Sequence, residues 1–449
     1  MTKRIYKLGL LAFSLLAYSG SSSAEIVVAR YLEFGATATD DPELLDAGSG
    51  SELVLTVKPS VELKFTGNRF GSVVVGEVEH FQYTDSKVDI TDPRLFARTR
   101  GTLIDNLLYL DTTLTYSKLA PDNNFLRPTD DSDPALNLKA RLFVYREFGQ
   151  LAELYVGLNH ASFFEQADES ATSQDNGIDF SIGRNPKYGG FLWGFGGYYS
   201  EDESDTNFFK NSSLYASVGS TISKTLYAEV SAGSEYREFV TGLDTAAPTT
   251  VEDEDSSLWE AGVTWSPNES TKLYAGYGER FFGSGPSLQL SHRDANSIFK
   301  ATYTRDVTRS GPSLNTITPL TNNTNDSLVD PTTVNIDSSN LSSELDQPFV
   351  DNRLKLSYKL TGRRSDVIID GVYSEQDQIS GDETIKTWLG RLVFDRKLSD
   401  LTLLRLQYDY QQSDAPLRAN RNYTENRFAV KFILNFDKVD SSRDDEFAE

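Results

Sequence analysis

The sequence contains no cysteine, one methionine and three histidines among its 449 residues. The absence of cysteine excludes disulfides, thiolate metal sites, a cysteine nucleophile and a lipid-modified cysteine. Positive charge is also scarce, because 43 Lys and Arg stand against 66 Asp and Glu and give a net charge of −23. This balance disfavours nucleic-acid binding through a basic surface. We therefore expect no cofactor, no metal site and no nucleic-acid partner.

Long apolar runs are missing after the first two dozen residues. Hydrophobic residues make up 38% of the chain and the mean hydropathy is −0.41. No later run approaches the roughly 20 residues that a membrane-spanning helix needs. This excludes a bundle of transmembrane helices and leaves two classes. The chain is either a secreted all-β protein or a membrane protein whose apolar residues occupy every second position.

The beginning of the chain predicts export. Lys3, Arg4 and Lys7 precede the apolar stretch Leu8–Ala17, and small residues follow it up to Ala24. A basic head, a short apolar core and small residues before a cleavage site describe a Sec signal peptide. An uncleaved membrane anchor is the alternative, but the apolar core is too short to span a bilayer. We predict a signal peptide over residues 1–24.

Apolar and polar residues alternate with period two through most of the remaining sequence. Near the end of the chain, for example, Phe428, Val430 and Phe432 alternate with Ala429 and Lys431. In a β-strand the two sets face opposite sides, so that one face is apolar and the other is polar. Marking these runs gives about twenty strands. Among the marked strands are 94–105, 177–185, 211–222 and 256–266.

The gaps between the predicted strands alternate in length. Every second gap is tight, as at Gly67–Arg69 and Ser223–Lys224, while the gaps between them are mostly longer and polar, as at 119–134 and 309–349. Short periplasmic turns alternating with long outer loops are typical of outer-membrane barrels. A soluble β-helix or propeller would need a fixed-period repeat, which we do not find. The predicted fold is an all-β, transmembrane, antiparallel up-and-down β-barrel of 18–20 strands over residues 25–436.

The alternation also predicts which face lines the lumen. In lipid the backbone must be fully paired, so the sheet closes and its apolar face looks outward. The charged residues at the alternate positions then become lumen-lining candidates: Arg280, Arg293, Arg353, Lys355, Lys359, Asp366, Asp370, Arg391, Asp395, Arg405 and Asp409. Such a wall implies a hydrated interior. Alternatively, the charges pair across strands and fill the barrel, and both can hold together.

Other residues predict contacts with the membrane and its machinery. Trp259 and Trp265 lie six residues apart on one face of one strand and suit the two aromatic girdles at the membrane surfaces, although Trp259 could instead lie in a loop. Phe436 ends the last strand and resembles the C-terminal signal read by the barrel-assembly machinery. We expect the acidic tail 437–449 to be disordered in the periplasm. Acidic loops such as 252–255 are solvated surfaces or bridge to lipopolysaccharide through divalent cations.

The segment 309–349 is polar, poor in aromatic residues and too long for an ordinary hairpin loop. It is either a disordered outer loop or a lid that folds into the lumen. Catalytic signals are weak by comparison. His160 precedes Ser162 by one step along a strand, superficially like the dyad of a barrel phospholipase, but two such residues alone are an ordinary pattern. There is no phosphate loop and no metal-binding motif, and we expect no enzyme.

One segment resembles a known family. Trp259-x2-Gly262-x2-Trp265-x-Pro267 is followed by Leu273-x2-Gly276-Tyr277-Gly278-x-Arg280-x-Phe282-Gly283, then by His292-Arg293 and Tyr303-x-Arg305. This resembles the β-barrel porin family found with exopolysaccharide and PEP-CTERM (exosortase) gene clusters. The region near Thr39-Asp40-Asp41 and Val57-Lys58-Pro59 also fits, except that the family commonly has Asn where this chain has Asp41.

The resemblance implies an outer-membrane export pore for exopolysaccharide or capsular polysaccharide. It also implies a periplasmic polysaccharide-export protein as partner, one that lacks its own membrane-crossing part. A direct substrate role for Arg280, His292 or Arg293 is one reading of the motif. The other is that its glycines allow close strand packing and that Arg280 is a girdle or lumen charge. A scaffold barrel filled by its own charges and a general diffusion porin for small solutes remain alternative functions.

Overall fold

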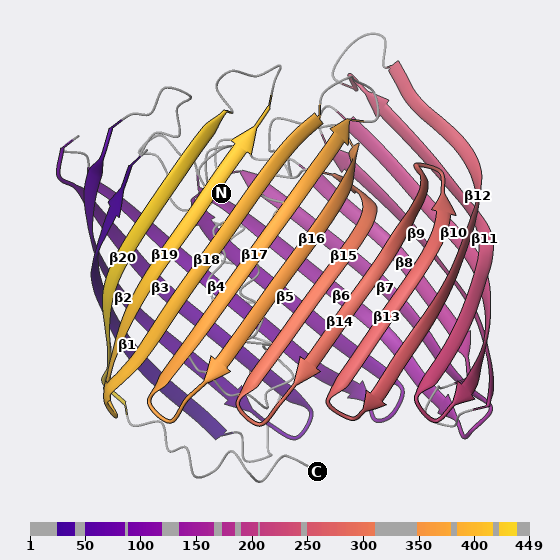
Figure 1. The fold of residues 1–449 in the computed structure, drawn as a ribbon, viewed down its shortest axis with the longest axis horizontal. Coiled ribbons are helices and arrows are strands. Elements are labelled where there is room, and N and C mark those ends of the chain that lie inside the picture. Colours follow the sequence, from indigo (N-terminus) through magenta and orange to yellow (C-terminus); the bar gives the residue numbers. More distant parts are fainter. Residues whose placement is uncertain are drawn as a thin grey trace.

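The computed structural model describes residues 25–40, 50–85, 89–118, 134–165, 173–184, 190–204, 207–243, 249–309, 348–378, 384–415 and 422–437. These residues form one sheet of 20 strands (Figure 1). The strands of the first half are β1 Glu25–Thr39, β2 Glu52–Thr66, β3 Phe70–Tyr83, β4 Asp89–Ile104, β5 Leu108–Lys118, β6 Pro134–Phe148, β7 Ala152–Glu165, β8 Ser173–Gly183, β9 Phe191–Ser204 and β10 Asn207–Ser223. Those of the second half are β11 Leu226–Thr241, β12 Thr249–Asn268, β13 Thr271–Arg280, β14 Gly283–Arg293, β15 Ser297–Arg309, β16 Pro348–Thr361, β17 Ser365–Gln378, β18 Thr384–Ser399, β19 Thr402–Asp414 and β20 Tyr423–Asn435.

The sheet closes on itself. Each strand pairs antiparallel with the strands before and after it, and β1 pairs with β20 from Tyr31 opposite Asn435 to Thr39 opposite Arg427. Closure leaves no open sheet edge, which is what a strand structure in lipid requires. The predicted all-β, up-and-down barrel is confirmed, at the upper end of the expected strand number. In the described part of the chain, no helix is long and apolar enough to cross a membrane.

The polarity of the two barrel faces is the reverse of that in a soluble protein, with apolar side chains outside and charged ones inside. On β2 the apolar side chains Leu53, Leu55 and Val57 are 40–46% exposed, whereas Glu52 and Glu62 of the same strand are 7% and 2% exposed. The same alternation continues from strand to strand, because directly paired residues share a face. Soluble proteins rarely expose an apolar surface this continuous. The outward face is therefore built for lipid and the inward face for polar groups.

Several strands extend beyond the limits that alternation predicted. β4 begins at Asp89, β8 at Ser173, β10 at Asn207 and β12 at Thr249, each several residues before the marked start. The alternation of apolar and polar residues ends where the outward positions become polar, but backbone pairing continues past that point. Figure 1 shows this extension best at β12, which rises above its neighbours at the upper right, while the tight turns lie at the lower end. The gaps between strands at the end opposite the tight turns are therefore shorter than the sequence predicted.

The orientation of the two ends can be tested with a protease-cleavable epitope. We expect an epitope placed after Leu243, between β11 and β12, to be cut on intact cells. The same epitope placed at the tight turn Glu269–Ser270 should be protected until the outer membrane is permeabilised. Longer loops face the exterior in outer-membrane barrels, which gives this expectation. Reversed accessibility would invert the orientation of every loop.

Close packing of β10 against β11 depends on Gly233. A Cβ atom at this position would lie 1.9 Å from the carbonyl oxygen of Leu214 and 2.7 Å from the Cα atom of Tyr215. Both are backbone atoms, so the strands would have to separate. We expect Gly233→Ala to lower the free energy of unfolding by about 1–3 kcal/mol, measured by denaturant titration in lipid vesicles. Gly76→Ala is the matched control, because a Cβ there meets nothing within 4 Å, and it should leave stability unchanged.

Just past β20, the chain is hydrogen-bonded to the first strand, β1. The Asp437 carboxylate accepts hydrogen bonds from the Arg30 backbone N–H at 2.8 Å and from the Arg30 guanidinium at 2.7 and 3.0 Å. These bonds hold the pKa of Asp437 below its usual range. The predicted acidic tail therefore begins with an ordered residue, and residues 438–449 lie outside the described part of the chain, as does the predicted signal peptide. Phe436 is 57% exposed, and its role in assembly stays a prediction.

Candidate functional site: the charged inner wall

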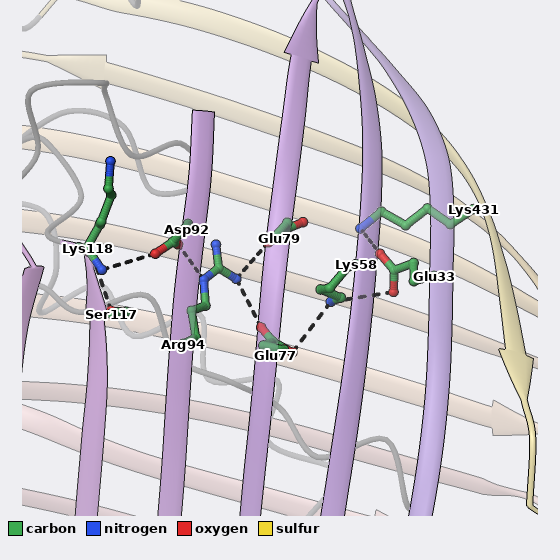
Figure 2. Close-up of polar contacts among 9 residues, drawn as sticks. All are labelled: Glu33, Lys58, Glu77, Glu79, Asp92, Arg94, Ser117, Lys118 and Lys431. Carbon is green, nitrogen blue, oxygen red and sulfur yellow. Dashed lines mark hydrogen bonds and ion pairs between the residues drawn. The ribbon is translucent and has the colours of Figure 1, made fainter. Parts of the chain in front are cut away.

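A chain of ionic contacts crosses the inner wall over six neighbouring strands (Figure 2). It begins on β20, where the Lys431 ammonium lies 2.9 Å from the Glu33 carboxylate of β1. The Lys58 ammonium of β2 lies 3.5 Å from the other Glu33 oxygen and 4.0 Å from Glu77 of β3. Glu33 is 2% exposed, so it depends on the two lysines for its charge balance. Alternating signs on adjacent strands thus tie the closing strand pair to the strands that follow.

Arg94 of β4 is the most highly coordinated cation of this chain. Its guanidinium contacts Asp92 at 2.5 Å, Glu79 at 2.8 Å and Glu77 at 3.3 Å. The Arg94 side chain is 10% exposed, and those of the three carboxylates are 0–8% exposed. Asp92 also accepts a hydrogen bond from the backbone N–H of Lys118 on β5, at 3.1 Å. One buried cation therefore contacts three carboxylates on β3 and β4, and Asp92 extends the contacts to β5.

The second half of the wall repeats this arrangement with residues predicted from the sequence. Arg391 of β18 donates to Asp409 of β19 at 2.7 Å. Arg405 of β19 donates to Asp395 of β18 at 2.8 Å. The two bonds cross the same strand pair in opposite directions. Arg353 makes a comparable contact with Asp351 on β16. The pairing of charges across and along strands, left open by the sequence, is present here.

All eleven lumen candidates lie at inward positions of the register, as followed from strand to strand. Asp370 is only 7% exposed, and one of its carboxylate oxygens has no hydrogen-bond partner. Arg293, Lys359 and Asp366 lie near the tight-turn ends of their strands, and Lys355 lies midway along β16. The candidates are therefore brought onto one surface but not into one pocket. They form a lining.

The segment that resembles the porin family forms part of this wall. The Arg280 guanidinium donates to Glu235 of β11 at 3.0 Å and to Asp306 of β15 at 3.3 Å, so it is a lumen charge. His292 points outward and its Nδ1 lies 2.8 Å from the Thr271 hydroxyl. Gly278 allows close strand packing, because a Cβ there would lie 2.4 Å from the backbone carbonyl oxygen of Trp259, whereas Gly262 accommodates an aromatic side chain. A Cβ at Gly262 would lie 2.4 Å from the Tyr274 hydroxyl oxygen, which shows how closely that ring covers the glycine.

The two tryptophans predicted for the girdles both lie on the outward face of β12. Trp259 is 38% exposed and donates its indole N–H to Glu279 at 3.1 Å, and Trp265 is 46% exposed. Trp259 lies within the strand and not in a loop. Six residues of strand separate them by about 20 Å along the chain. The spacing is compatible with the apolar band of an outer-membrane barrel, about 25 Å tall.

The sequence reasoning missed the polar residues of the first strands, including Glu33, Lys58 and Arg94. The signal was available, since Lys58 and Glu62 alternate with the apolar Val57 and Val61. The segment expected to be a disordered loop or a lid falls mostly outside the described residues, which stop at 309 and resume at 348. No group of three His, Asp or Glu side chains that could hold a metal ion is found in the described ranges.

No protein-family model matches this sequence, and no curated protein matches it. Solved structures do match. OccK2 (OpdF) of Pseudomonas aeruginosa, solved with glucuronate, is 11% identical over 91% of this chain and 98% of its own, with a TM-score of 0.38. The ferric citrate transporter FecA is 10% identical over 91% of this chain and 78% of its own, with a TM-score of 0.48.

The FrpB iron transporter of Neisseria meningitidis is 6% identical over 91% of this chain and 81% of its own, with a TM-score of 0.46. Because each TM-score is below 0.5, none of these likenesses bears on substrate or mechanism. The fold rests on the strand pairing of this chain alone, which closes all 20 strands into one ring.

Proposed function

We propose that this protein is an integral outer-membrane channel that passes a hydrophilic polymer, with exopolysaccharide or capsular polysaccharide as its substrate. The observation that carries the proposal is a closed ring of 20 strands with apolar side chains outside and charged side chains inside. Barrels of 16–18 strands already enclose an aqueous channel. Passage needs no chemistry from the protein, and the driving force comes from polymerisation and from the inner-membrane machinery.

The balance of charges on the inner wall favours a glycan over a small ion. A ring of one sign selects ions of the opposite sign. Here cations pair one to one with carboxylates on neighbouring strands, as with Arg391 and Asp409 or Arg405 and Asp395. Such a wall attracts water without a strong net field. A neutral or weakly charged hydrophilic chain suits it, which agrees with the resemblance of the segment Trp259–Arg305 to the exopolysaccharide-associated porins.

The proposal includes partners. We expect a periplasmic polysaccharide-export protein to deliver the polymer to the tight-turn end of the barrel. Lipid and lipopolysaccharide surround its outward face, and the barrel-assembly machinery inserts it, with Phe436 as its signal. The acidic residues 252–255, expected in a loop, lie within β12, and Asp255 is exposed on its outward face near the loop end. Lipopolysaccharide bridged by divalent cations would contact this part of β12.

Deleting the gene tests the function directly. We expect the deletion strain to lose surface polysaccharide and to retain polymer in the periplasm, both measured by immunoblot of cell fractions, with the gene restored on a plasmid as control. If surface polysaccharide is unchanged and small-solute uptake falls, the protein is a general diffusion porin. If neither changes, the scaffold function takes its place.

A further inference from the structure

Three polar side chains are joined in a row on the outward face of β7 and β8. The Ser162 Oγ lies 2.8 Å from His160 Nε2, and His160 Nδ1 lies 2.7 Å from the Asn176 Oδ1. His160 and Asn176 are directly opposite each other in the register. The neighbouring Asn159 bonds to the lumen residue Asp179 at 2.6 Å, so the alternate residues face out. The pore does not use this row, and nothing assigned to the inner wall explains it.

The two hydrogen bonds of His160 determine which of its ring nitrogens carries the proton. An amide oxygen can only accept a hydrogen bond, so His160 Nδ1 carries the proton that it donates to Asn176. Nε2 is then bare and accepts from the Ser162 hydroxyl. This is the tautomer in which a histidine takes the proton of a serine nucleophile, and the third residue holds the ring in that orientation. Serine, histidine and an orienting side chain are recognised by geometry and not by sequence order.

The position of the row along the strands indicates its substrate. Below it on the same outward face of β7 are Leu154, Val156 and Leu158, and Leu158 is 52% exposed. Above them the outward positions are polar at His160 and Ser162, and the aromatic Phe164 follows. On β8 the same change falls between Ile178 and Asn176, whose strand begins at Ser173. The row therefore lies where an apolar belt meets a polar rim. In a bilayer that is the level at which head groups join acyl chains.

Two of the three side chains are exposed, and a further hydrogen-bond donor lies beside them. His160 and Asn176 are exposed, and Ser162 is 6% exposed beside them. Gln174 lies directly opposite Ser162 on β8 and is exposed as well. A glutamine amide N–H can stabilise the oxyanion of an acyl-transfer intermediate. The site thus offers a nucleophile, a base, an orienting residue and a side-chain donor.

We propose that Ser162, His160 and Asn176 form a hydrolytic site that cleaves acyl esters of membrane lipids. The Ser162 Oγ bonds to the ester carbonyl carbon while its proton passes to His160 Nε2. The bond from that carbon to the alcohol oxygen breaks, and the departing oxygen takes the proton from His160. Water then attacks the acyl-serine, gives a proton through His160 to Ser162, and releases a fatty acid. The donor from Gln174 faces the carbonyl oxygen in both steps.

The test uses the full chain folded into vesicles of dioleoylphosphatidylcholine, with released oleate measured by mass spectrometry. We expect oleate release by the wild-type protein. Ser162→Ala should lower the rate by at least about 100-fold and Asn176→Leu by at least about 10-fold. Asn176→Asp keeps the acceptor for Nδ1 and should retain most of the activity. The dialkyl-ether analogue of the lipid should not be cleaved. A fluorophosphonate probe should label Ser162 with loss of fluoride.

Ser212→Ala on β10 is the matched control. Ser212 also faces outward near the loop end, and its cross-strand neighbours are Tyr199 and Tyr236 instead of a histidine. Its rate should equal that of the wild type. Circular dichroism and protease resistance report whether each variant has folded, and the two Asn176 variants carry the test if Ser162→Ala does not fold. Oleate release that survives Ser162→Ala, equal rates for Asn176→Leu and Asn176→Asp, or neither release nor labelling by the folded wild-type chain would each overturn the proposal.

Discussion

Replacing Arg94 by methionine should lower the free energy of unfolding of the barrel by about 3–5 kcal/mol. The Arg94 guanidinium contacts Asp92, Glu77 and Glu79, whose side chains are at most 8% exposed. Without it, three carboxylates remain close together on the inner wall with little water to solvate them. Lys58, the next cation along the chain of contacts, reaches only Glu77 among the three, at 4.0 Å. Denaturant titration of the folded protein in lipid vesicles measures the loss.

Arg69→Gln provides the matched control. Arg69 also bonds to a carboxylate, that of Asp105 at 2.7 Å, but the two side chains are 57% and 62% exposed. Exposed pairs contribute between 0 and about 1 kcal/mol. A large loss for Arg94→Met beside a small one for Arg69→Gln would show that burial and not the number of ion pairs sets the stability of the wall. Equal losses would mean that lumen water solvates the three carboxylates as well as bulk water does.

Alternation predicted the fold because it reports directly on the two faces of a barrel strand. The pattern ending at Phe432 and the tight gap at Gly67–Arg69 both correspond to observed elements, since the first is in β20 and the second separates β2 from β3. Strand limits at the rim were not predictable in this way. At Lys210 and Ser212 of β10 and at Thr250 of β12 the outward side chains are no longer apolar, and only backbone pairing with the neighbouring strand extends the sheet.

The sequence predicts on which face of the sheet each site residue lies, but not which side chains contact each other. The period of two places Arg391 and Asp409 inward, but their contact depends on the register of β18 against β19, which no single strand encodes. The same holds on the outside. His160 and Ser162 are visible in the sequence as neighbours on one face, whereas Asn176 is sixteen residues further on and reaches His160 only through the pairing of β7 with β8.

Removing the cations from one side of the inner wall should shift the ion selectivity of the channel toward cations severalfold. The variant replaces four inward residues of β16, β18 and β19 by serine: Lys355, Lys359, Arg391 and Arg405. Four inward carboxylates on β17, β18 and β19 then dominate this part of the wall: Asp366, Asp370, Asp395 and Asp409. Charged side chains at close quarters in a pore set its selectivity. The reversal potential of the channel in a planar bilayer under a salt gradient measures the shift.

The control must change the net charge equally without changing the lumen. Serine at four cations at or beside the tight turns, Arg69, Arg363, Arg364 and Arg396, meets that condition. These residues lie at the turn end, and their loss should leave the reversal potential near that of the wild type, because charges beyond about a Debye length are screened by salt. If both variants shift selectivity equally, net charge and not the wall governs permeation. If the lumen variant folds and shifts nothing, ions do not pass along this face, and the path for a hydrophilic chain must follow another part of the inner wall.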